Sequence, residues 1–232
     1  MTMSRTAQDH GLSRQRAALA VVLTAVAGAV DALSITSLGH VFTGIMTGNI
    51  VLLGVAAGQG AAAETSRSGV AFAGFVAGLF AGYQLAHPAA PVARWLRAGV
   101  ALAFGIELLL VAAFFVVWLA AGGHPAGGLL FAAISLSAVA MGIQSATATR
   151  LAVTGISTTY VTGTLNALMG SLAVVGRLGA DAVSQAAALV ALGAGAALAI
   201  LAQRIEPLVA PVVPLAILTV AVALALLSKD MP

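Results

Sequence analysis

Long runs of apolar residues, separated by short polar segments, follow one another along the chain after a polar start. Each run has 17 to 22 residues, and a helix of about 20 residues crosses the hydrocarbon core of a bilayer. The pattern predicts an all-α polytopic membrane protein in contact with the lipid bilayer, behind a disordered tail at residues 1–13. The apolar runs cover residues 17–36, 42–58, 70–86, 99–120, 129–147, 156–175, 186–203 and 208–228.

Two of these runs, 42–58 and 156–175, are interrupted by glycine and polar residues. The basic residues indicate whether they cross, because cytoplasmic loops are enriched in Lys and Arg. With eight crossings and the N-terminus inside, six of the ten basic residues fall inside; if the two interrupted runs re-enter, eight do. We therefore predict six full spans, two broken or re-entrant segments and a cytoplasmic N-terminus.

The interrupted runs also carry an internal repeat. Thr47-Gly48 recurs as Thr162-Gly163 after 115 residues, and the same shift places Gly78 on Gly193. This predicts two repeats of about 115 residues, a first membrane repeat at 14–120 and a second at 121–232. Since each repeat would hold three full spans, the second must be inverted relative to the first, as in many transporters with a site at the midplane.

Four segments carry a resemblance to a known family. They are residues 30–32, 39–49, 141–146 and 158–164, which resemble the YoaK family, the bacterial membrane domain of unknown function 1275. The similarity extends from about residue 17 to residue 228. It implies a small protein of the bacterial inner membrane with about six spans, and it assigns no catalytic or binding residue.

The composition excludes several classes of function. With 61% hydrophobic and 7% charged residues, the chain cannot be a water-soluble domain. The sequence pI of about 10.2 arises from a net charge of only +3, without a dense basic run, so we expect no nucleic-acid partner. The chain has no cysteine, and no motif of a hydrolase, nucleotide-binding or metal site is present in usable form. We expect no enzyme activity, cofactor or metal.

The paired Thr-Gly motifs are the candidate substrate site. A membrane helix that begins at such a motif exposes backbone N–H groups that lipid cannot satisfy, and these donors attract an anion or a polar solute. Alternatively, the same residues only pack and hydrogen-bond neighbouring helices. The candidate substrate-binding residues are Thr47, Gly48, Asn49, Thr162, Gly163, Thr164 and Gln144.

Asp31 and Glu107 are the acids that lie well inside predicted spans. An acid in hydrocarbon is costly and is a functional candidate by default, so both are candidates for proton coupling. A structural role, as a cap or in an ion pair, is the alternative for each of them. Glu107 has no acidic counterpart in the second repeat, because the repeat distance places Val222 there.

The function predicted from these features is a small transporter or permease for an unidentified small polar or anionic solute. The alternative is a non-transporting membrane scaffold or partner-binding subunit. Gly74, Gly78 and Gly82 recur every four residues, which marks a tight seam between helices. The helix on the other side of this seam belongs either to the same chain or to a second copy in a homo-oligomer.

Overall fold

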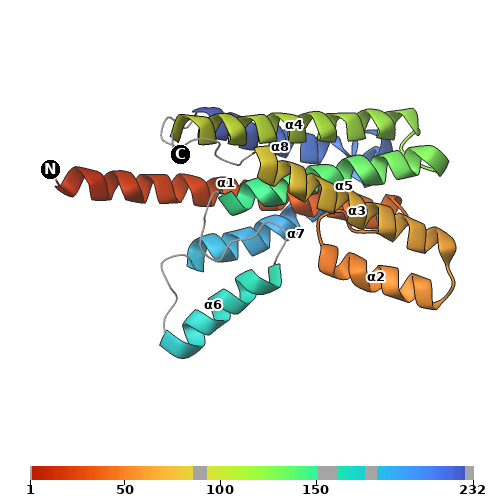
Figure 1. Ribbon diagram of the computed structural model, residues 1–232, viewed down its shortest axis with the longest axis horizontal. Coiled ribbons are helices and arrows are strands. Elements are labelled where there is room, and N and C mark those ends of the chain that lie inside the picture. Colours follow the sequence, from red (N-terminus) through yellow and green to blue (C-terminus); the bar gives the residue numbers. More distant parts are fainter. Residues whose placement is uncertain (1, 86–92, 151–160, 176–181, 228–232) are drawn as a thin grey trace.

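A computed structural model describes residues 2–85, 93–150, 161–175 and 182–227, and all regular elements in these ranges are helices (Figure 1). This confirms the predicted all-α class. The helices are α1 (Thr2–Ser37), α2 (Met46–Gly58), α3 (Ala62–Leu85), α4 (Ala93–Ala120), α5 (Gly127–Arg150), α6 (Val161–Val175), α7 (Ala182–Ile205), the 3₁₀ turn η1 (Pro207–Val209) and α8 (Val212–Leu227).

Six stretches in the described ranges are long and apolar enough to cross a membrane. They confirm the six predicted spans and lie at Gln15–Ser37, Ala62–Leu85, Gly99–Ala120, Gly127–Thr149, Ala182–Ile205 and Pro207–Leu226. The two interrupted runs form the short helices α2 and α6, of 13 and 15 residues. Helix α2 does not reach the length of about 20 residues that a full crossing needs, and α6 has 15 residues between two ranges that the structure does not describe.

The first helix is longer than its span. Helix α1 begins at Thr2 and continues without a break into the first span. The segment contains no proline, and adding a turn to an existing helix avoids the cost of nucleating a new one. The polar start of the chain therefore extends the first span as a helix.

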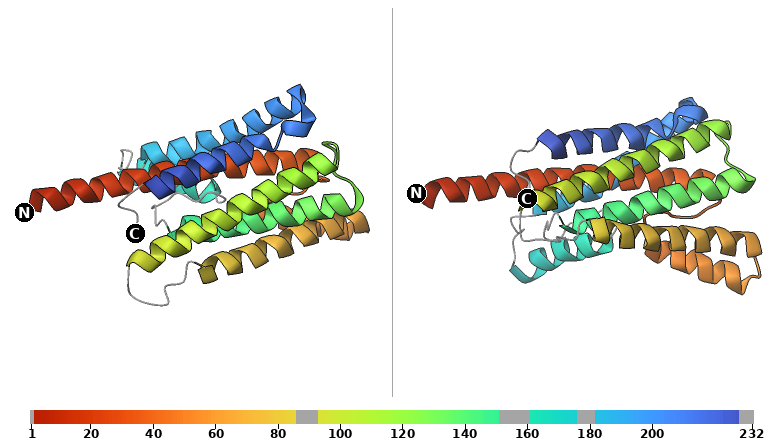
Figure 2. Two further views of the ribbon diagram at one scale, coloured as in Figure 1. Left: turned by 90° about the horizontal axis from the view of Figure 1, so that it is seen from above. Right: turned by 45° about the horizontal axis from the view of Figure 1, so that its top comes forward.

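Helices α1 and α5 form the centre of the bundle. Their spans are 67% and 56% buried, whereas those of α3, α4, α7 and α8 are between 22% and 28% buried. The long helices run roughly along one direction, while α2 and α6 lie on one side toward opposite ends (Figures 1 and 2). Apolar side chains such as Phe80, Leu109 and Val190 point outward, with more than 60% of their surface exposed, as expected of helices that face lipid.

The helix pairings are unchanged when the two halves of the chain are exchanged. The most extensive pairs are α3 with α5 and α1 with α7, and this exchange converts one into the other. It likewise relates α4 with α5 to α8 with α1, and α2 with α3 to α6 with α7. The first helix of each half thus packs on the third helix of the other half.

The glycine stripe of α3 packs within the chain. A Cβ at Gly74 would lie 3.1 Å from the Cβ of Ala138, and a Cβ at Gly82 would lie 2.7 Å from that of Ala146. At Gly78 it would collide with the carbonyl oxygen of Val139. The stripe is therefore covered by α5, so that of the two alternatives for Gly74, Gly78 and Gly82 the structure agrees with a partner helix in the same chain and not with a homo-oligomer contact.

A second seam of the same kind joins α1 to α7. A Cβ at Gly28 would collide with the carbonyl oxygen of Leu192, and one at Gly195 with that of Ala25. In the seam between α3 and α5, a Cβ at Gly142 would collide with the carbonyl oxygen of Phe75, and one at Gly78 with that of Val139.

The two seams correspond residue by residue. A shift of 114 residues carries Ala25 and Gly28 onto Val139 and Gly142, and a shift of 117 carries Phe75 and Gly78 onto Leu192 and Gly195. The predicted match of Gly78 with Gly193 is therefore wrong by two residues. Gly193 has no atom within 4 Å of the position of a Cβ.

Candidate functional site

The chain turns back into the bundle between α1 and α2. Helix α1 ends at Ser37, and Gly39 and His40 follow with positive φ angles of 75° and 63°. The backbone angle at Gly39 favours glycine, and a Cβ there would lie 2.6 Å from Nη1 of Arg67 and displace the end of that side chain. The segment that follows reaches Asp31, which lies six residues, or about 9 Å, before the end of α1.

Asp31 holds this returning segment in place. Its Oδ1 accepts hydrogen bonds from the backbone N–H groups of Thr43 and Gly44, each at 2.8 Å. The hydroxyl groups of Ser34 and Thr43 form a further contact of 3.0 Å beside them. Because lipid offers no partner for exposed N–H groups, the carboxylate supplies the acceptor that this break in helical structure requires.

The second carboxylate oxygen of Asp31 is left open. The residue is 4% exposed, and Oδ2 has no hydrogen-bond partner among the described residues. A Cβ at Gly44 would lie 2.9 Å from Oδ2, so a larger residue at this position would crowd that oxygen. The site thus presents a buried, unpaired acceptor just before the first turn of α2.

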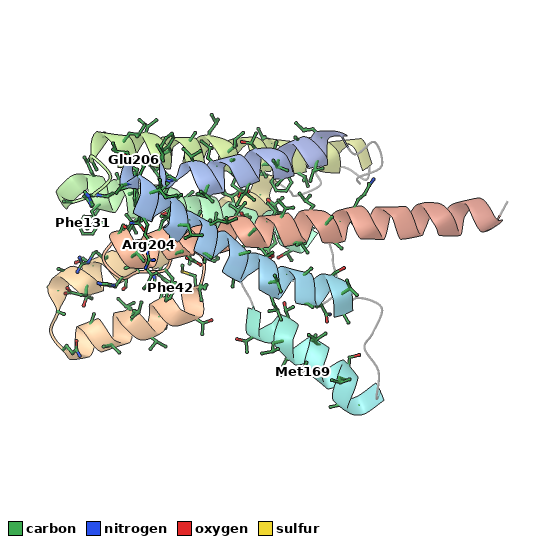
Figure 3. All side chains as sticks on the ribbon, turned by 180° about the vertical axis from the view of Figure 1, so that it is seen from behind. Phe42, Phe131, Met169, Arg204 and Glu206 are labelled. Carbon is green, nitrogen blue, oxygen red and sulfur yellow. The ribbon has the colours of Figure 1, made fainter. Side chains whose placement is uncertain are left out.

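The first Thr-Gly motif lies in the first turn of α2, and its three residues have different surroundings. Thr47 is exposed. The side-chain amide of Asn49 is buried and donates through Nδ2 to the carbonyl oxygen of Ser68 at 3.0 Å, which ties α2 to α3. A Cβ at Gly48 would lie 3.2 Å from the ring of Phe42, the residue labelled in Figure 3.

The second motif begins α6, which lies beside α7. Thr162 is exposed, Gly163 is half-buried and Thr164 is buried. Met169 and its neighbours on α6 extend away from the bundle in Figure 3, and Met169 is 45% exposed. Residues 151–160, which precede this motif, lie outside the described residues, so the first part of the resemblance segment 158–164 is not described.

Gln144 joins the two central helices. It is buried on α5 and donates through Nε2 to the carbonyl oxygen of Leu23 on α1 at 3.0 Å. Its Oε1 has no partner among the described residues. The structure thus gives Gln144 an interhelical bond, as the packing alternative expects, and leaves one acceptor free.

Glu107 lies on α4 and is fully buried. Phe104 and Val111, one turn away on either side, belong to an apolar cluster that also contains Leu23 and Met141. Neither carboxylate oxygen has a partner among the described residues. Glu107 is thus a buried acid in apolar surroundings, with no hydrogen bond of the kind that holds Asp31.

Sequence reasoning identified Asp31 but not its partners. The residues that bind it, Thr43 and Gly44, precede the motif that was singled out and lie 12 and 13 residues from Asp31. The signal for them was the Gly39-His40 turn, which reverses the chain and brings these residues alongside α1. In the ranges that the structure describes, no group of three or more His, Asp and Glu side chains is placed to hold a metal ion.

Comparison with known proteins identifies relatives. A family model described as "Protein of unknown function (DUF1275)" matches residues 19–225. The chain is similar to UPF0700 transmembrane protein YoaK of Bacillus subtilis (strain 168), with 36% identity over 163 residues, which cover 70% of this chain and 69% of that protein. No solved structure matches the chain.

Proposed function

The chain belongs to the DUF1275 family, and from this premise we propose that it is a small transporter or permease of the bacterial inner membrane. The observation that carries the proposal is the buried carboxylate of Asp31, which binds the segment before α2 with one oxygen and leaves the other unpaired. Non-helical backbone inside a membrane is tolerated where it is buried in protein or lines a cavity, and the unpaired oxygen favours the second case. The solute is a small polar molecule or ion.

The helix pairing supports the inverted repeat that such a mechanism uses. Exchange of the two halves reproduces every major pairing, and the glycine seams correspond position by position. In transporters built this way, the site lies where the two repeats meet, at discontinuous helices. Under this proposal the solute contacts the two short helices and Gln144, through Thr47, Gly48, Asn49, Thr162, Gly163, Thr164 and Gln144.

Asp31 and Glu107 are the proposed proton-coupling groups. Both are buried, and a buried charge without a partner is costly, so a proton is the simplest ligand for their unpaired oxygens. Asp31 also holds a segment of backbone, so a change in its proton occupancy acts on the start of α2. Glu107 lacks such a contact, and we propose that it contributes less to coupling.

A non-transporting scaffold is the second candidate. Two observations favour it: Asn49 donates its amide to the backbone of α3, and Gly48 packs closely against Phe42. Both contacts belong to helix packing. Under this alternative, the first Thr-Gly motif only fixes α2 to its neighbours, and the bilayer and a protein partner replace the solute.

Uptake into proteoliposomes separates the two candidates. The full chain is reconstituted, and uptake of labelled methylammonium, urea and formate is measured with and without a pH gradient. The transporter proposal expects uptake of at least one probe above protein-free vesicles, with a gradient dependence that Asp31→Asn removes. Gly54→Ala is the matched control, because a Cβ at Gly54 on α2 meets no atom within 4 Å. Wild-type vesicles that take up none of the three probes would favour the scaffold.

A further inference from the structure

We infer that the α2 end of the proposed site receives a hydrogen-bond donor, in the form of the ammonium group of a protonated amine, and not an anion. This inference rests on the proposed function and narrows the class of its solute. It follows from the way in which Asp31, Thr43 and Gly44 are arranged before the first turn of α2.

The carboxylate of Asp31 already places a negative charge just before this helix end. A helix N-terminus attracts negative charge through its partial positive charge and free N–H groups. Here the carboxylate of Asp31 lies next to the start of α2 and accepts the N–H groups of Thr43 and Gly44. A second anion would have to lie close to this carboxylate, and like charges a few ångströms apart repel strongly in a medium of low dielectric constant.

The group that remains to be satisfied is an acceptor. In its ionised form the carboxylate of Asp31 offers only acceptor positions, and its Oδ2 is buried without a partner. The ammonium group and the proton proposed above therefore compete for this oxygen. Among the described residues the ion pair found is Arg67 with Glu64, and no basic side chain pairs with Asp31. The incoming group must therefore bring its own donor, and a positive charge on it strengthens the bond.

A metal cation fits this position less well than an ammonium group. Hard cations such as Ca²⁺ and Mg²⁺ take six or more oxygen ligands. Here Oδ1 is already occupied by two N–H groups, and the hydroxyls of Ser34 and Thr43 bond to each other. Oδ2 is one free oxygen that can accept one N–H donor, and Gly44 has no side chain to crowd it.

This acceptor belongs to one half only. The shift of 114 residues that aligns the glycine seam of α1 with that of α5 places Ser145 at the position of Asp31. The second half therefore lacks the carboxylate that occupies the start of α2. The pseudo-symmetric fold thus provides a single ammonium position for each chain.

Binding of methylammonium to the full chain in detergent tests the inference, with formate as the anionic probe. Both are titrated by thermal shift at constant ionic strength. Methylammonium is expected to raise the melting temperature of the wild type and formate is not. Asp31→Asn removes the charge of the acceptor and Gly44→Ala fills the space beside Oδ2, so each should weaken methylammonium binding about tenfold or more. Gly54→Ala should bind as the wild type does.

The other outcomes separate the inference from the function beneath it. Stabilisation by formate but not by methylammonium would overturn the ammonium position and leave a solute site standing. Methylammonium binding that Asp31→Asn leaves intact would also overturn it, and this isosteric variant serves even if Gly44→Ala fails to fold. Absence of binding by either probe, together with no uptake into proteoliposomes, would count against the transporter itself.

Discussion

Replacement of Asp31 should destabilise the protein in a graded manner. In Asp31→Ala the N–H groups of Thr43 and Gly44, bonded at 2.8 Å in the wild type, lose their acceptor while buried. A buried donor without a partner costs about 1–3 kcal/mol, so the two together cost about 2–6 kcal/mol. Asp31→Asn retains an acceptor oxygen and loses only the contribution of the charge, about 1 kcal/mol for each bond.

The unfolding free energy is measured by titration with SDS in mixed micelles, with the fluorescence of the buried Trp118 as the signal. The chain has two tryptophans, so a Trp95→Phe background leaves Trp118 as the single reporter. Glu107→Gln is the control, since neither oxygen of Glu107 has a partner to lose, and it should stay within about 1 kcal/mol of the wild type. Equal stability of Asp31→Ala and Asp31→Asn would refute the reasoning, because the two bonds would then contribute nothing.

Three further predictions follow from the packing and the topology. Gly195→Ala should lower the unfolding free energy by about 1–3 kcal/mol, because its Cβ collides with the backbone of Ala25, whereas Gly193→Ala, in open space, should raise it by up to about 1 kcal/mol; equal effects would contradict the seam. Single cysteines at Gln15 and Gln59, both exposed, should react with an impermeant maleimide from opposite faces of the membrane, and labelling from the same face would indicate that the second apolar run crosses. Trp118→Phe removes the bond of 2.8 Å from Nε1 to the carbonyl oxygen of Pro207 and should cost at least about 1 kcal/mol in an SDS titration followed by circular dichroism instead of tryptophan fluorescence; an unchanged value would mean that water replaces this bond.

The spans were predictable because their signal is local. A run of about 20 apolar residues is sufficient to predict a helix that crosses a membrane, and the six long helices agree with those runs. The sequence also predicted that α2 and α6 differ from the full spans, since glycine and polar residues interrupt both runs. Where the helix begins within such a run was less predictable: α2 starts at Met46, four residues after the apolar run does.

The contacts of the site were not predictable, because they depend on a turn and on the register between helices. The positive φ angles of Gly39 and His40 set the direction in which the chain returns to Asp31, and sequence spacing does not encode that direction. The predicted match of Gly78 with Gly193 was wrong for a similar reason. A uniform repeat of 115 residues hides two different shifts, 114 for the first helix of each half and 117 for the third, because the connecting segments differ in length.

The glycine seams are alike in the two halves of the chain, whereas the buried acids are not, and this difference bears on the proposed mechanism. The two glycine seams are alike in their backbone contacts, so a movement of one half against the other meets similar packing at both seams. Among the residues whose burial is described, the buried acids are Asp31 and Glu107; both belong to the first half, and Ser145 stands at the position of Asp31 in the second. We therefore expect a ligand or proton that binds Asp31 to act on α2 and not on α6. It shifts the balance between two conformations only if its affinity differs between them. The half that carries the acids is thus the half in which we expect substitutions to alter coupling.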